Sequence, residues 1–158
     1  MNIIALDIDD CILPSEQTCV GETGDTLALL EINLKRLVLL CNKWDMEIYI
    51  ISAWSSILTT DTNKNLLIEN QNLVAYEYKG EHSAQMICKY LSGYIHGVKD
   101  TSKETAIHNL LNKGHKVVTI EDTDFSHILH NNHLFCKTVG FISNRHLCRI
   151  REFIEDVI

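Results

Sequence analysis

The sequence contains few residues that interrupt regular structure: its 158 residues include one proline and seven glycines. It has no low-complexity stretch, no long run of one charge and no internal repeat, which argues against linkers and repeat arrays. No apolar run is long enough to cross a bilayer. The length is typical of one domain that buries a substantial core, so we expect a single domain over residues 1–158.

The sequence also lacks a Cys-x-x-Cys pair, a basic N-terminal segment and an excess of positive charge, and these absences limit its possible partners and its cellular compartment. The six cysteines include no Cys-x-x-Cys pair, which argues against a zinc ribbon or a redox motif. The first residues lack a basic segment and contain acids, so we expect no signal peptide and predict reduced cysteines in the cytoplasm. Lys and Arg number 14 against 21 Asp and Glu, a formal net charge of −7. This charge disfavours a broad electrostatic grip on nucleic acid but leaves room for a local basic groove.

What the sequence does contain is an apolar segment, Asn2–Leu6, that ends in the acids Asp7, Asp9 and Asp10. A short run rich in Ile and Leu predicts a buried strand. Residues two apart on an extended chain share a face, so Asp7 and Asp9 should lie together. Neighbouring carboxylates repel each other, and the arrangement costs energy unless a cation or a reaction uses it. The pair therefore indicates a functional site at the end of the first strand.

The rest of the pattern predicts strands that alternate with helices. We expect strands over Asn2–Leu6, Glu47–Ile51, Leu73–Tyr78, Lys116–Ile120 and Leu134–Val139. We expect helices over Leu27–Lys43, Ser55–Glu69, Ser83–Leu91 and Ser102–Asn112, a short helix before residue 134, and a helix from Asn144 onward. Pro14–Thr26 is expected to be a loop, and Thr101 with Glu104 a capping box. The fold class is then α/β, a Rossmann-like parallel sheet with helices on both faces and ligands at the carboxyl ends of its strands.

Four chemical groups fall at those strand ends or at a helix start. They are Asp7-Ile-Asp9, Ser52 after Ile-Tyr-Ile-Ile, Lys103 at the start of a helix, and Glu121-Asp122 after Val-Val-Thr-Ile. Their order and setting resemble the haloacid dehalogenase (HAD) superfamily of phosphotransferases, and the resemblance spans nearly the whole chain. It implies a HAD-type core and a phosphatase that hydrolyses phosphate monoesters.

The resemblance assigns a role to each group. Asp7 would be the nucleophile that forms an aspartyl-phosphate, and Asp9 the acid that protonates the leaving oxygen and then activates water. Asp122, a carboxylate oxygen of Asp7 and the backbone carbonyl of Asp9 would hold one Mg²⁺ ion, which favours oxygen ligands. Ser52 would bind a phosphoryl oxygen. Lys103 would neutralise Asp7 and the transferring group.

The sequence also departs from the family pattern. Asp10 stands where glycine is commonest, and Cys11 where Thr or Val is usual. Ser126 replaces the Asp that usually follows four residues after Asp122, so either Glu121 or Asp124 could supplement Asp122. Lys99 competes with Lys103 as the motif lysine, although Lys103 begins the apolar-periodic helix. Neither Cys11 nor Cys19 has a base partner that would make it a nucleophile.

HAD enzymes usually carry a cap domain that selects the substrate. Neither Cys11–Asp45 nor Ala53–Asp100 leaves room for one, so the site should be open to a bulky substrate or be closed by a second subunit. The segment Ser52-Ala53-Trp54 places an aromatic beside that site, where Trp54 could stack on a base or pack beneath the next helix. Two finer likenesses, to the phosphatase domain of polynucleotide kinase-phosphatases and to HAD domains linked to RNA repair, favour a nucleotide or polynucleotide phosphate. A phosphoprotein phosphatase and an idle binding module are the alternatives.

The spacing of His127, His130 and His133 by three residues could line one side of a short helix. Histidine rows of this kind are commonly surface or packing residues, and we expect no metal site there.

Overall fold

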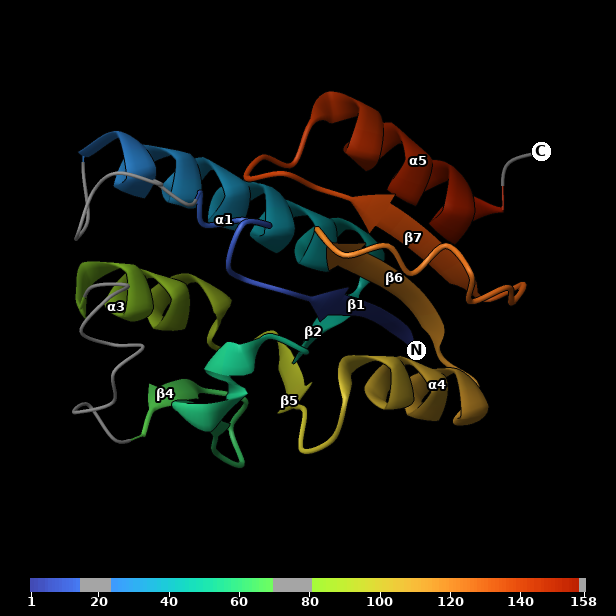
Figure 1. Ribbon diagram of the computed structural model, residues 1–158, viewed down its shortest axis with the longest axis horizontal. Helices are drawn as coiled ribbons and strands as arrows, with labels where there is room; N and C mark the ends of the chain where they lie inside the picture. Colours follow the sequence, from blue (N-terminus) through green and yellow to red (C-terminus); the bar gives the residue numbers. More distant parts are fainter. Residues whose placement is uncertain (15–23, 70–80, 157–158) are drawn as a thin grey trace.

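The centre of the computed structural model, which describes residues 1–14, 24–69 and 81–156, is a five-stranded parallel sheet (Figure 1). Its strands lie in the order β5-β2-β1-β6-β7. Their bounds are β1 Asn2–Leu6, β2 Met46–Ile50, β5 Ile95–Val98, β6 Lys116–Glu121 and β7 His133–Lys137. The helices are α1 Gly24–Trp44, α3 Glu81–Leu91, α4 Lys103–Asn112 and α5 Asn144–Glu155. The predicted α/β class, with a Rossmann-like parallel sheet between helices, is confirmed.

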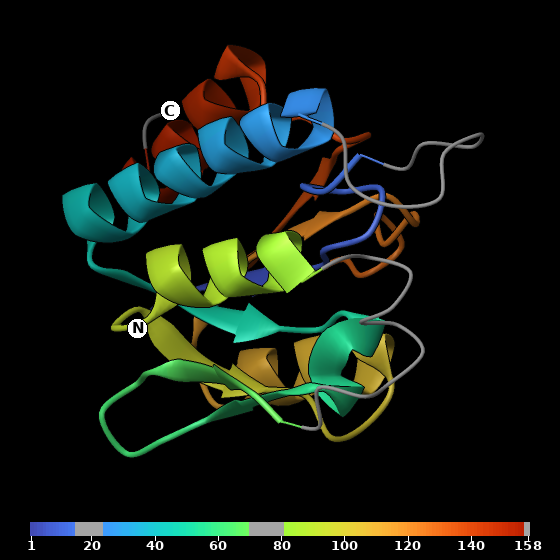
Figure 2. The ribbon, with the colours of Figure 1, turned by 90° about the vertical axis from the view of Figure 1, so that its left-hand side faces the viewer.

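The two faces of the sheet are covered by different helices. Side chains alternate along β1, so Ile4 and Leu6 pack with α1, α3 and α5, whereas Ile3 and Ala5 pack with α4. Figure 2 shows α1, α3 and α5 on one side of the sheet and α4 on the other. Strands buried on both faces are nearly continuous in apolar residues, which is why the short Ile- and Val-rich runs were recognisable in the sequence.

β1 lies at the centre of the sheet, where the direction of chain progression reverses. From β1 the chain moves outward to β2 and β5, and it then returns to the other side of β1 to form β6 and β7. Leu6 at the end of β1 pairs with Ile50 on one side and Ile120 on the other. Parallel α/β sheets bind ligands at this kind of reversal, beyond the carboxyl ends of the strands.

The segment expected to be a helix over Ser55–Glu69 is different, and that prediction is wrong. It contains a single 3₁₀ turn, η1 (Ala53–Ser56), followed by an antiparallel hairpin of β3 (Leu58–Thr60) and β4 (Leu66–Ile68). Asp61 makes the turn, because its carboxylate accepts the backbone N–H groups of Asn63 and Asn65. This Asp–Asn turn chemistry outweighs the apolar spacing that suggested a helix.

One strand was missed, and three smaller expectations also need correction. β5 was not predicted, because its four residues include the polar His96 and the small Gly97. The short helix before residue 134 is absent, and residues 123–132 form turns, a bend and irregular backbone. The cap of α4 is Ser102, whose side chain accepts the N–H of Thr105, rather than Thr101. α1 begins at Gly24, inside the expected loop.

The expected strand Leu73–Tyr78 lies outside the described residues, as do residues 15–23 of the expected loop. In the part of the chain that the structure describes, no separate cap domain is evident: the hairpin and α3 pack on the core itself. None of the helices in this part is both long enough and apolar enough to cross a membrane.

Candidate functional site

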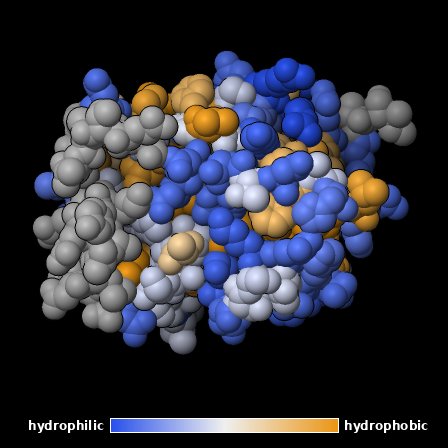
Figure 3. Space-filling model, in the orientation of Figure 1, coloured by the Kyte–Doolittle hydropathy of each residue, from blue (hydrophilic) through white to orange (hydrophobic). Residues whose placement is uncertain are grey.

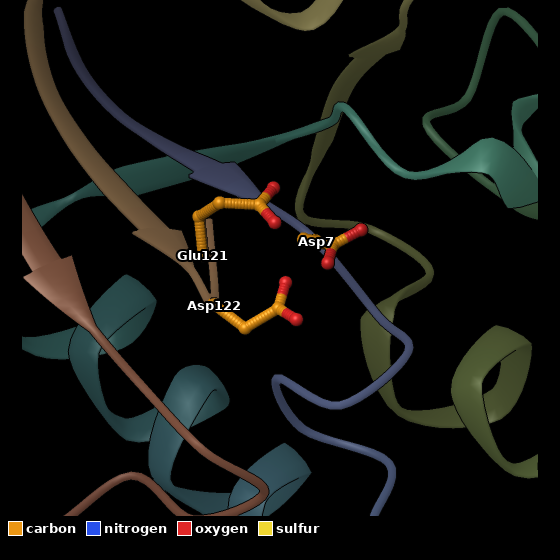
Figure 4. A group of neighbouring side chains, drawn as sticks. All are labelled: Asp7, Glu121 and Asp122. Carbon is orange, nitrogen blue, oxygen red and sulfur yellow. The ribbon is translucent and has the colours of Figure 1, made fainter. Parts of the chain in front are cut away.

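Three acids meet between the ends of β1 and β6, and we call them the acidic cluster: Asp7, Glu121 and Asp122. Asp7 follows β1, Glu121 ends β6 and Asp122 comes next. The pairing of Leu6 with Ile120 and a 3.0 Å hydrogen bond from Asp7 N to Ile120 O hold the two strand ends together. One carboxylate oxygen from each acid lies within 4.8 Å of the others. Figure 4 shows the three carboxylates turned toward one another.

Lys103 supplies the cation of this site. It is the first residue of α4, and its Nζ lies 3.4 Å from Asp7 Oδ1 and 3.1 Å from Glu121 Oε2. The competing Lys99 instead donates from Nζ to the carbonyl of Thr101 at 3.2 Å. The structure therefore places Lys103, and not Lys99, beside the acids.

Burial sets the electrostatics of the acidic cluster. Glu121 is fully buried, and burial, followed by its hydrogen bond to Asp122 and the charge of Asp7, raises its pKa to about 8. Burial likewise raises the pKa of Asp7, against the opposing effects of Glu121 and Lys103. The hydrogen bond from Glu121 is the main reason that the pKa of Asp122 is lowered. These shifts favour one proton shared within the acidic cluster, most readily on the buried Glu121, since three carboxylates this close cannot all ionise cheaply.

The pKa of Lys103 reflects the same balance. Burial favours its neutral form, but the charge of Asp7 and the hydrogen bonds and charge of Glu121 outweigh that effect and raise the pKa. Lys103 is accordingly a fixed positive charge against Asp7, and its side chain is 30% exposed, so it can also meet a ligand.

Ser52 lies just beyond β2, at the same edge of the sheet. The N–H of Ile51 donates to Leu6 O at 2.9 Å, which holds this segment against the end of β1. Ser52 is buried and caps η1, because its Oγ accepts the N–H of Trp54 at 3.2 Å. That bond uses the oxygen as acceptor and leaves its hydroxyl proton for another partner. Ala53, the first residue of η1, is exposed.

Trp54 contributes in a way that the sequence did not indicate. It is 1% exposed and belongs to the core, so of the two alternatives, stacking on a base or packing beneath the next segment, the packing one describes its position. Its indole Nε1 donates to Asp9 Oδ2 at 3.1 Å. The indole thus fixes the carboxylate of Asp9, a contact that sequence spacing cannot reveal because it joins two separate strand ends.

The chain makes a tight turn directly after β1. The carbonyl of Ile8 accepts the N–H groups of Cys11, Ile12 and Leu13. Asp10 has a φ of 60°, in the left-handed region, at the position where glycine was the expected family residue. Aspartate is one of the few other residues that tolerate this conformation.

Cys11 does not provide a nucleophile in this arrangement. Its Sγ lies 2.8 Å from Thr138 Oγ1 and 3.3 Å from the carbonyl of Ile120. Burial raises the pKa of its thiol well above the ordinary value. A thiol that stays protonated is a packing group. Cys19 lies outside the described residues.

Asp124 does not supplement Asp122. It is exposed, and its Oδ1 accepts the N–H of Ser126 at 2.8 Å within the loop after β6. Glu121 is the acid that joins Asp7 and Asp122.

The three histidines in the same loop have separate partners. His127 faces Glu104, and His130 accepts the N–H of Asn132. His133 Nδ1 donates to Ile128 O at 3.0 Å, so its Nε2 accepts the hydroxyl of Thr119 at 2.8 Å. Both ring nitrogens of His133 are therefore engaged within the protein.

The acidic cluster has donor chemistry that fits Mg²⁺. Carboxylate oxygens are the hard ligands that this ion prefers, and Asp7 and Asp122 offer them from adjacent strand ends. Figure 3 shows mostly hydrophilic side chains over the middle of this face of the molecule.

Comparison with known proteins adds no relative to this picture: no protein-family model, no curated protein and no solved structure matches the chain.

Proposed function

We propose that this protein is a magnesium-dependent phosphomonoester hydrolase that acts through an aspartyl-phosphate on a nucleotide or polynucleotide phosphate. One observation carries the proposal: Lys103 Nζ lies 3.4 Å from Asp7 Oδ1 at the end of the central strand, with Asp122 beside them. A nucleophilic carboxylate needs such a cation to approach an anionic phosphate. The order of motifs that resembles the HAD superfamily supports the same assignment.

The chain's own residues have distinct tasks in this proposal. Asp7 attacks phosphorus, and the P–O bond to the leaving group breaks as the Asp7–P bond forms. Asp9, held by the indole of Trp54, gives its proton to the leaving oxygen and later takes one from the attacking water. Lys103 offsets the charge of Asp7 and the phosphoryl group, and the free hydroxyl proton of Ser52 binds a phosphoryl oxygen.

Asp7 and Asp122, with the backbone carbonyl of Asp9, would hold Mg²⁺. The ion would supply positive charge that lowers the pKa of Asp7 and screens the phosphate. Glu121 sits behind these ligands, where its contacts with Lys103 and Asp122 orient both side chains.

The proposal includes a cytoplasmic location. The five cysteines in the described part of the chain, Cys11, Cys41, Cys88, Cys136 and Cys148, are free thiols, which suits a reducing compartment.

A phosphate-release screen tests the proposed function. The panel contains an aryl phosphate, nucleotides, 3′- and 5′-phosphorylated oligonucleotides, sugar phosphates and phosphopeptides, each with magnesium or with chelator. We expect magnesium-dependent release, with the nucleotide and oligonucleotide substrates ahead of sugar phosphates. Release that is unchanged in chelator contradicts the metal assignment. Preference for phosphopeptides favours a phosphoprotein phosphatase, and no release from any substrate favours an idle binding module.

A further inference from the structure

A second polar site lies beside β7, the edge strand next to β6. It is a cavity of about 350 Å³ between the loop after β6, β7 and α5. We call it the basic pocket; its polar lining comes from Ser126, His130, His133, Lys137 and Arg149. The apolar part of the lining includes Leu134 and Phe135. Pockets for small organic ligands begin at about 300 Å³, so this one is larger than a lone phosphate needs.

The charge of the basic pocket comes from Lys137 and Arg149, which are both exposed. Among the residues that the structure describes, neither forms an ion pair with a carboxylate. Arg149 Nη2 donates to Phe135 O at 3.2 Å, which fixes the guanidinium against β7 and leaves its other N–H groups for a ligand. Asp124 is within electrostatic reach of Lys137, but it is held in the loop by Ser126.

His133 adds shape but no charge to the pocket. Burial lowers its pKa, and both its ring nitrogens are engaged, with Thr119 and with the carbonyl of Ile128. The attraction for an anion therefore rests on Lys137 and Arg149.

The basic pocket begins one strand away from the acidic cluster. Lys137 at the end of β7 pairs with Glu121 at the end of β6, and Thr138 N donates to Glu121 O at 3.1 Å. Paired residues on neighbouring strands lie about 4.8 Å apart and share a face of the sheet. Figure 1 shows β7 directly outside β6. A ligand that places one phosphate at Asp7 must therefore be longer than that phosphate group if it is also to contact Lys137 and Arg149.

We propose that the basic pocket binds an internal backbone phosphate of a single-stranded polynucleotide whose terminal phosphate lies at Asp7. This inference rests on the proposed function and narrows it from nucleotides to polynucleotides. Lys137 and Arg149 contact the phosphodiester, and arginine suits this group because its parallel N–H donors match phosphate oxygens. The remaining volume and the apolar lining of Leu134 and Phe135 accommodate the attached sugar or base.

The test is a direct measurement of binding, made in chelator so that it does not depend on turnover. A short fluorescent oligonucleotide with a terminal phosphate is titrated with the wild-type protein and with the double variant Lys137→Gln/Arg149→Gln. The matched control is Lys43→Gln/Arg151→Gln, which removes the same charges from the groove between α1 and α5. We expect the dissociation constant to rise roughly tenfold or more in the pocket variant and to change little in the control. The salt slope of binding should shrink by about 0.7 for each phosphate that the variant no longer neutralises.

Several outcomes overturn the inference. Equal weakening in both double variants means that overall charge, and not the pocket, governs binding. Unchanged binding in the pocket variant means that the strand lies elsewhere. A phosphopeptide whose binding depends on the pocket more than the oligonucleotide does would assign the pocket to protein substrates.

Two further measurements show whether a loss of binding comes from misfolding and whether the pocket inference can fail independently of the proposed function. Arg149→Lys keeps the charge but not the forked donor geometry, and it should bind between the wild type and the double variant if the protein is folded. Pocket-dependent binding without any aryl phosphate release refutes the proposed function and leaves the pocket supported. Aryl phosphate release without pocket-dependent binding supports the proposed function and refutes the inference about the basic pocket.

Discussion

The acidic cluster and the basic pocket lie on neighbouring strands of one sheet but are built in opposite ways. Asp7 and Glu121 are buried, Asp122 is partly buried, and Lys103 lies against the carboxylates of Asp7 and Glu121. Lys137 and Arg149 are exposed, and their charges face solvent. The difference indicates that the two sites serve different tasks. The acidic cluster has the fixed geometry that a reaction at Asp7 would need. The basic pocket has the accessible positive charge that would hold the rest of a long ligand.

Removing the proposed nucleophile should separate the two regions most strongly. We expect Asp7→Asn to reduce aryl phosphate turnover to background, because an amide cannot replace the attacking carboxylate. Oligonucleotide binding in chelator should persist, since the basic pocket is untouched. Phosphate release, thermal melting and fluorescence anisotropy on the same preparation check this. Substantial turnover in a folded variant would remove Asp7 from the nucleophile role.

Removing the cation of the acidic cluster should have the next largest effect. We expect Lys103→Met to lower kcat by roughly a hundredfold, because one well-placed charge is worth about 3 kcal/mol to the transition state. Lys99→Met is the matched control, since Lys99 Nζ donates to Thr101 O instead of an acid. Steady-state kinetics of both variants decide the matter, and a larger loss in the Lys99 variant would contradict the assignment.

The indole of Trp54 should matter only where Asp9 must donate a proton. Trp54→Phe keeps the ring in the core but removes the bond to Asp9. We expect turnover of nucleoside phosphates, whose leaving groups are poor, to fall about tenfold, and turnover of an activated aryl phosphate to fall less. Trp44→Phe is the control, because the N–H of Trp44 binds Glu155 on the surface. An equal loss on both substrates would indicate a packing role alone.

The smallest effect concerns His133, the uncharged histidine of the basic pocket. Its folded pKa is lowered from 6.5, chiefly by burial. Its neutral form therefore stabilises the fold fully above about pH 6.5, and this contribution is lost as the pH falls. Urea unfolding at several pH values should show a shallower acid loss for His133→Gln, by at most about 1.4 kcal/mol per pH unit. Identical slopes for the wild type and His133→Gln would contradict a neutral His133.

The sequence predicted which charged side chains lie together better than it predicted the segments around them. Asp7, Lys103 and Asp122 were identifiable because strand ends and a helix start can be read locally, and a parallel sheet gathers its strand ends at one edge. The β3–β4 hairpin was missed because Asp61 sets its turn through side-chain bonds that compete with apolar periodicity.

Contacts between distant segments explain what remained unpredicted. The bond between Trp54 and Asp9 and the pairing of Lys137 with Glu121 depend on three-dimensional neighbours that no local pattern encodes. The choice of Glu121 over Asp124 was open for the same reason. Only the hydrogen bond from Ser126 shows that Asp124 turns back into its own loop.

The central position of β1 has a consequence for how the site comes into being. Asn2 pairs with Lys116, so the strand that carries Asp7 finds one of its two neighbours only after most of the chain is available. Contacts this distant along the chain close late and slowly in folding. The acidic cluster therefore has no local precursor: its like charges are brought together only as the middle of the sheet closes. Phosphate turnover would then appear only once folding is complete. A partly folded intermediate without β6 would have no activity.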